Sequence, residues 1–109
     1  MARFGRSKFP SKAEIRQDHI HGSGDVNHAV SVYDNGGKTA DRYTVVFDDQ
    51  PERGRGMYAA LGLSEHPGNP QGVSEFTTAM KGRHLGKRVQ FRQLPAEVQN
   101  HVIARLRDT

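Results

Sequence analysis

Residues 29–47 read AVSVYDNGGKTADRYTVVF, and this stretch decides the fold. It contains two runs, 29–33 and 43–47, that are rich in β-branched and aromatic residues and partly alternate, as strands do. Between them stands Asn35-Gly36-Gly37, a sequence that tolerates positive φ and indicates a turn. The stretch therefore predicts an antiparallel hairpin with an extended loop. Two strands alone are marginal in water, so the hairpin must pack against further elements.

The C-terminal part of the chain supplies the element that covers this hairpin. Residues 94–107 carry an apolar stripe at helical spacing, made of Leu94, Val98, Val102, Ile103 and Leu106. Pro95 at the first helical position and Glu97 in the first turn favour a helix that begins there. We expect this helix to cover one face of the sheet.

Residues 87–92, KRVQFR, precede the predicted helix and alternate polar with apolar residues. The alternation predicts a strand with Val89 and Phe91 on one face. The opposite face then carries Arg88, Gln90 and Arg92.

The middle of the chain gives weaker signals. Residues 57–63, MYAALGL, predict a third strand, with a helical turn as the alternative because of the alanines. Residues 64–74 contain two prolines and two glycines, which exclude long regular structure there. The fold class expected is α+β, with a small antiparallel sheet of three to four strands and a C-terminal helix. Residues 28–109 form this single domain, and residues 1–27 form a basic, mobile arm.

Composition excludes several classes of protein. The 109 residues include no cysteine, which excludes disulfides, thiol catalysis and thiolate metal sites. No run of about 18 apolar residues is present, so no membrane partner is expected. We expect a cytoplasmic protein without a cofactor.

The net charge of +4 hides an uneven distribution. The balance is +4 over residues 1–16, −5 over residues 17–80 and +5 over residues 81–109. Basic ends that flank an acidic middle can attract a polyanion at the ends. The alternative is that the ends fold back and neutralise the middle.

The basic residues of the two ends are the candidate nucleic-acid contacts. If residues 87–92 form a strand, its outer face and the approach loop present cations suited to phosphate contact. Edge strands also carry Lys and Arg simply to oppose aggregation. No motif for sequence-specific readout accompanies them. The candidate residues are Lys81, Arg83, Lys87, Arg88 and Arg92, with Arg3, Arg6, Lys8 and Lys12 in the arm.

The histidines offer a metal-site alternative. His19 and His21 point to the same side of an extended segment, His28 follows seven residues later, and Asp18 or Asp25 can add an oxygen ligand. Because a His-x-His pair is common and this stretch is polar, solvent-exposed histidines are the favoured interpretation and no metal ligand is assigned.

Three pieces of the chain, taken together, resemble a group of known sequences. They are YDNGG at 33–37 followed by DRYTVVF at 41–47, PQGVS at 70–74, and HLGKRV at 84–89 leading into Leu94-Pro95. The combination resembles small bacterial proteins associated with phages, plasmids and prophages, over residues 30–106. These proteins have no established activity, so the resemblance implies an accessory role in a mobile element and no catalytic residue.

The sequence therefore predicts a non-enzymatic accessory protein that contacts a nucleic-acid backbone. One alternative is a host-protein-binding inhibitor that uses the acidic middle and the 64–74 loop. A second alternative is a small metal-dependent enzyme.

Overall fold

The predicted hairpin forms the centre of the sheet. The computed structural model describes residues 18–21, 27–52 and 56–108. Strand β2 (Asn27–Asp34) pairs antiparallel with β3 (Tyr43–Pro51), in a register that sets Val32 opposite Val45. Gly36 and Gly37 in the connecting turn have φ values of 78° and 90°, a conformation that glycine adopts without steric cost. The hairpin prediction is confirmed.

Two more strands extend the sheet beyond β3. Strand β4 (Met57–Leu63) pairs with β3, so these residues form the predicted strand and not a helical turn. Strand β5 (Ser74–Met80) pairs with β4 and was not predicted. Of its seven residues only Ala79 is buried, so the segment lacks the apolar alternation by which strands are recognised. Residues 64–73 form the expected loop without helix or strand.

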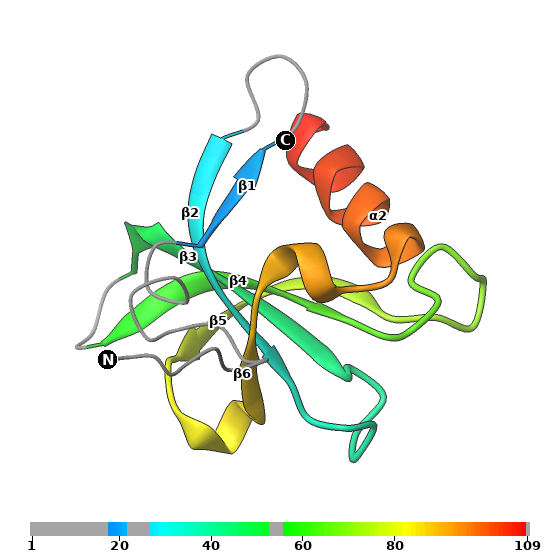
Figure 1. Ribbon diagram of the computed structural model, residues 1–109, viewed down its shortest axis with the longest axis horizontal. Helices are drawn as coiled ribbons and strands as arrows, with labels where there is room; N and C mark the ends of the chain where they lie inside the picture. Colours follow the sequence, from blue (N-terminus) through cyan, green and yellow to red (C-terminus); the bar gives the residue numbers. More distant parts are fainter. Residues whose placement is uncertain (1–17, 22–26, 53–55, 109) are drawn as a thin grey trace, which may run out of the picture.

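Two short strands share the other edge of β2 (Figure 1). Strand β1 (His19–His21) pairs with the beginning of β2, and β6 (Lys87–Val89) pairs with its end. Over the described residues the sheet thus has six strands, in the order β1-β2-β3-β4-β5 with β6 beside β2. The α+β class is confirmed, but the expected number of three to four strands is wrong.

The predicted strand over residues 87–92 ends early, at Val89. The short 3-10 helix η3 (Phe91–Gln93) follows, where the Gln90 N–H donates to the Gln93 side-chain oxygen at 2.8 Å. This turn carries the Phe91 side chain into the core, where it is 5% exposed. The side chains of 88, 90 and 92 therefore do not line one strand face, which corrects the prediction.

Part of the predicted N-terminal arm belongs to the sheet. Within β1, Ile20 is fully buried, and the Asp18 carbonyl accepts a hydrogen bond from the Val30 N–H at 3.0 Å. The rest of the 1–27 range, residues 1–17 and 22–26, lies outside the described residues.

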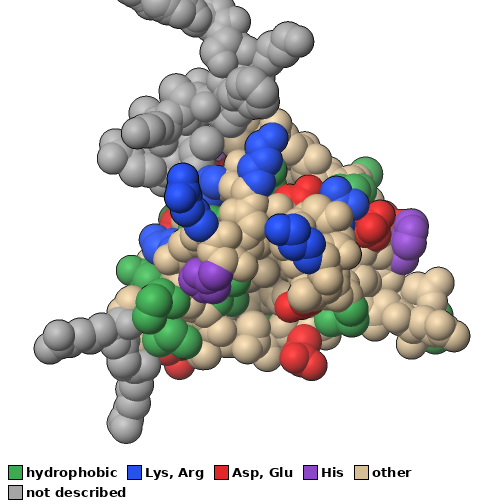
Figure 2. Space-filling view, turned by 90° about the horizontal axis from the view of Figure 1, so that it is seen from below, with side chains coloured by type: hydrophobic (Ala, Val, Ile, Leu, Met, Phe, Trp, Pro, Cys, Tyr) green, Lys and Arg blue, Asp and Glu red, His purple; other side chains and the backbone are tan. Residues whose placement is uncertain are grey.

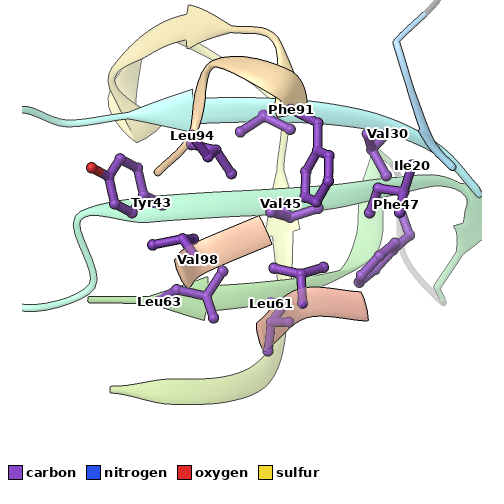
Figure 3. Close-up of a cluster of buried hydrophobic side chains, with 12 residues drawn as sticks. Ile20, Val30, Tyr43, Val45, Phe47, Leu61, Leu63, Phe91, Leu94 and Val98 are labelled. Carbon is purple, nitrogen blue, oxygen red and sulfur yellow. The ribbon is translucent and has the colours of Figure 1, made fainter. Parts of the chain in front are cut away.

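The C-terminal helix covers one face of the sheet, as predicted (Figure 1). It is α2 (Ala96–Arg107), and Pro95 is its N-cap residue and not its first helical residue, so the helix begins one residue later than predicted. Figure 3 shows the side chains of the sheet, of η3 and of the helix meeting in one apolar cluster. Burying a Val or Leu side chain contributes about 1.5–3 kcal/mol, so this layer holds the fold together. Its members are Ile20, Val30, Val32, Tyr43, Val45, Phe47, Leu61, Leu63, Phe91, Leu94, Val98 and Val102.

A smaller cluster lies on the opposite face of the sheet. Tyr33, Val46, Ala60 and Ala79 are buried there, with Leu85 packed against them. Leu85 comes from the 3-10 helix η2 (Arg83–Leu85), which links β5 to β6. Among the described residues, no helix has the length and apolar character needed to cross a membrane.

Candidate nucleic-acid interface

A tight turn places the basic segment 82–88 against the end of β2. Gly86 has a φ of 113°, and a Cβ atom built on it would lie 2.4 Å from the Asp34 carbonyl oxygen. Only glycine fits such a close approach of two backbones. The turn brings Lys87 and Arg88 into register with Asp34 and Tyr33 of β2.

Three of the predicted contact residues surround one pocket. Arg83, Lys87 and Arg88 line a depression of about 480 Å³ together with Tyr33, Gly82 and Gly86. The Arg88 guanidinium lies 5.6 Å from the centroid of the Tyr33 ring, within the range of a cation–π contact. Figure 2 looks at this end of the molecule and shows Lys and Arg side chains gathered on it, with a histidine among them. Such a group of cations can hold a phosphate.

Two carboxylates modulate the charge of this pocket. Burial is the main influence that raises the pKa of Asp18, and the positive charge of Arg88 acts in the opposite direction. The Arg42 guanidinium, by its hydrogen bonds, lowers the pKa of Asp34, and the charge of Lys87 contributes to the same effect. The pocket is therefore less positive than its three cations alone suggest.

Lys81 lies in a contact with an acidic neighbour. Its Nζ is 3.1 Å from Asp48 Oδ1 and 4.6 Å from the centroid of the Tyr58 ring. The Ser31 hydroxyl donates to the same carboxylate at 2.8 Å. An anion that binds Lys81 would therefore have to compete with Asp48.

Arg92 faces a different part of the surface. Its Nε donates to the Gln90 side-chain oxygen at 2.8 Å, and it lines a separate pocket of about 450 Å³ with Asp18, His19 and His21. Arg88 and Arg92 therefore line two different pockets and not one strand face. The other predicted contacts, Arg3, Arg6, Lys8 and Lys12, lie outside the described residues.

His19 and His21 lie close to each other, whereas His28 lies beside a carboxylate. The rings of His19 and His21 have centroids 5.8 Å apart, on one side of β1 as expected from their spacing. His28 instead contacts Asp49, with 3.3 Å between Nδ1 and Oδ2. Within the part of the chain that the structure describes, no three His, Asp or Glu side chains are grouped so that they could hold a metal ion.

A further pocket, of about 560 Å³, lies between the β2–β3 turn and the 64–73 loop. Arg42 lies at its wall and contacts two carboxylates, Asp34 at 2.8 Å and Glu65 at 3.3 Å. These carboxylates raise the pKa of Arg42, with the hydrogen bond to Asp34 as the main cause. The sequence indicated the loop as a candidate binding site but did not indicate Arg42. Arg42 joins that site only because the turn and the loop lie together in the folded chain.

Three of the predicted nucleic-acid contacts line one pocket, and much of the 64–73 loop lines another. Comparisons with protein-family models, with curated proteins and with solved structures found no match.

Proposed function

We propose that this chain is a non-enzymatic binding protein that contacts a nucleic-acid backbone through Arg83, Lys87 and Arg88. The observation that carries the proposal is the pocket of about 480 Å³, which these three cations line together with Tyr33. Phosphate groups attract Lys and Arg irrespective of base sequence, so these three cations favour contact with the nucleic-acid backbone. The resemblance to proteins of phages and plasmids supports an accessory role in a mobile element.

A salt titration tests the proposal. Binding of fluorescein-labelled, mixed-sequence DNA and RNA is measured by anisotropy between about 25 and 300 mM NaCl. Each phosphate contact contributes about 0.9 to the slope of log K against log salt on duplex DNA. Three contacts thus predict a slope of roughly −2.7, while lack of binding at low salt would refute the proposal.

Two variants separate the pocket from the overall charge. Arg83→Gln removes one exposed cation of the pocket and is expected to reduce the slope by about 1. Arg92→Gln makes the same change of charge in the other pocket and serves as the matched control. Equal effects of the two substitutions would show that net charge alone attracts the polyanion.

The second candidate function is the binding of a host protein through the 64–74 loop. The 560 Å³ pocket between this loop and the β2–β3 turn favours it, because Glu65 at its wall, half exposed beside Arg42, can also contact a basic side chain of a partner. Co-purification from the host discriminates between the two candidates. A stoichiometric partner that survives nuclease and high salt, and is lost in Glu65→Lys, favours protein binding.

A further inference from the structure

The outer edge of β5 is the feature of the molecule that the proposed function leaves unused. β5 is the last strand on its side of the sheet and pairs with β4 alone among the described strands. Residues 75–78 are all exposed, and the segment contains neither proline nor an internal lysine or arginine. Natural edge strands usually carry such residues, which oppose pairing with another strand.

The hydrogen-bonding pattern tells which groups of β5 face outward. The Ser64 N–H donates to the Val73 carbonyl at 2.9 Å, and bonded pairs alternate along an antiparallel ladder. In this register Glu75, Thr77 and Ala79 bond to β4. The backbone groups of Phe76, Thr78 and Met80 therefore point away from the sheet. The Ser74 carbonyl also points outward, and Arg105 Nη1 donates to it at 3.3 Å.

The two large exposed apolar side chains of the described residues lie on this strand. Phe76 is 39% exposed and Met80 is 50% exposed. Four residues apart in a strand, they project on the same side of the sheet. The Arg105 guanidinium lies 4.6 Å from the centroid of the Phe76 ring, so contact with protein covers part of that ring.

We infer that the β5 edge pairs antiparallel with the β5 edge of a second copy, about a twofold axis at Thr78. In this register the outward N–H and C=O groups of Thr78 bond to those of Thr78 in the second copy. The outward groups of Phe76 bond to those of Met80 in the second copy. Phe76 also packs against Met80 of the other copy, which covers both exposed side chains and makes a favourable sulfur–aromatic contact.

Charge complementarity selects this register. With the axis at Thr78, Glu75 of one copy lies opposite Lys81 of the other, whose ammonium group it shares with Asp48 of that copy, and the symmetry makes this contact twice. An axis at Thr77 would also let the outward backbone groups of the two strands bond to each other. It would, however, set Glu75 opposite Ala79, so that Glu75 faces no cation. The inference does not depend on nucleic-acid binding, since no residue of β5 lines the pocket of Arg83, Lys87 and Arg88.

Zero-length cross-linking of the full chain tests the register. A carbodiimide joins a carboxylate to an amine in direct contact. Glu75 and Lys81 of one chain are six residues apart, about 20 Å along a strand, so a link between them can form only between copies. The link of Lys81 to Asp48, which are 3.1 Å apart within one chain, is the internal positive control.

Analytical ultracentrifugation and amide exchange give independent readouts. We expect the mass to double with rising concentration, and the amides of Phe76, Thr78 and Met80 to become protected in parallel. A monomer up to about 1 mM would overturn the inference. A dimer without the 75–81 link, or without protection of these amides, would do the same.

Substitutions complete the test. Glu75→Lys replaces two attractive contacts by two repulsive ones and is expected to weaken association about tenfold. Glu97→Lys is the matched control, because it makes the same change of charge in a surface pair with His66 in which both side chains are more than half exposed. Thr78→Pro removes an outward N–H and leaves the bonds to β4, so it should abolish the dimer while the circular dichroism spectrum is retained. Unchanged association in both β5 variants would refute the pairing.

Discussion

Asp18 joins the first strand to the turn before the C-terminal helix, and its replacement gives a sharp test of the fold. Asp18 Oδ2 accepts a hydrogen bond from the Phe91 N–H at 2.7 Å, and Oδ1 accepts one from the His19 N–H at 3.0 Å. Phe91 itself is 5% exposed, so solvent has little access to its backbone. In Asp18→Ala the Phe91 N–H loses its only acceptor among the described residues.

A buried donor without an acceptor costs about 1–3 kcal/mol. We expect Asp18→Ala to lower the free energy of unfolding by about 2 kcal/mol, and the melting temperature by roughly 10 °C for a domain of this size. Urea unfolding at pH 7, followed by far-ultraviolet circular dichroism because the chain has no tryptophan, measures the loss. Asp49→Ala is the control, since the carboxylate of Asp49 makes no hydrogen bond within the described part of the chain other than the one to the His28 ring at the surface. A loss below about 0.5 kcal/mol, as the control should show, would refute the role of Asp18.

The pH dependence of this loss adds a second check. Burial, the main influence, raises the pKa of Asp18 in the folded protein above its usual 3.8. An acid with a raised pKa stabilises the folded state fully below 3.8, and this contribution is lost as the pH rises through the folded pKa. The cost of Asp18→Ala should therefore be greater at pH 4 than at pH 7. A greater cost at pH 7 would mean that the hydrogen bonds to the carboxylate outweigh its burial.

Two further predictions concern the β2–β3 turn and the basic pocket. Arg42, above all by its hydrogen bond, lowers the pKa of Asp34, so their contact stabilises the fold above pH 3.8 and the contribution is lost as the pH falls through the folded pKa. The difference in stability between wild type and Arg42→Gln should thus shrink below pH 3.8, and a constant difference down to pH 2 would contradict this. Gly86→Ala should cost more than about 3 kcal/mol, because its Cβ would lie 2.4 Å from a backbone carbonyl and its φ is positive. Gly37→Ala, with positive φ but no atom within 4 Å, should cost only about 1–2 kcal/mol in the same urea assay, and equal costs would contradict the close approach.

The central hairpin and the helix could be predicted because their side chains carry a local periodicity. Residues 43–47 are all buried, and the stripe at Val98 and Val102 lies in the core as its spacing indicates. β5 was not predicted because most side chains of this edge strand are exposed. β1 was not predicted because its three residues are too few to show a pattern. Both pair with a neighbouring strand through backbone hydrogen bonds, which leave little trace in side-chain hydrophobicity.

The candidate site was predictable only in part. The clustering of Lys and Arg near residues 81–92 indicated a basic region, but not which of them share a surface. The alternation that set Arg88 and Arg92 on one face stops at Val89, because Phe91 turns into the core and Asp18, 73 residues away in the chain, binds its N–H. That contact depends on long-range packing and has no signature in the local sequence.

By itself the sequence determined the α+β class, the hairpin, the helix and the basic character of the C-terminal region, since each follows from residues close together in the chain. Tertiary structure alone decided the number of strands, the division of the cations between two pockets and the exposure of the β5 edge. These features depend on pairing between distant segments, and a segment's own residues do not specify which neighbour will supply its hydrogen bonds and cover its side chains.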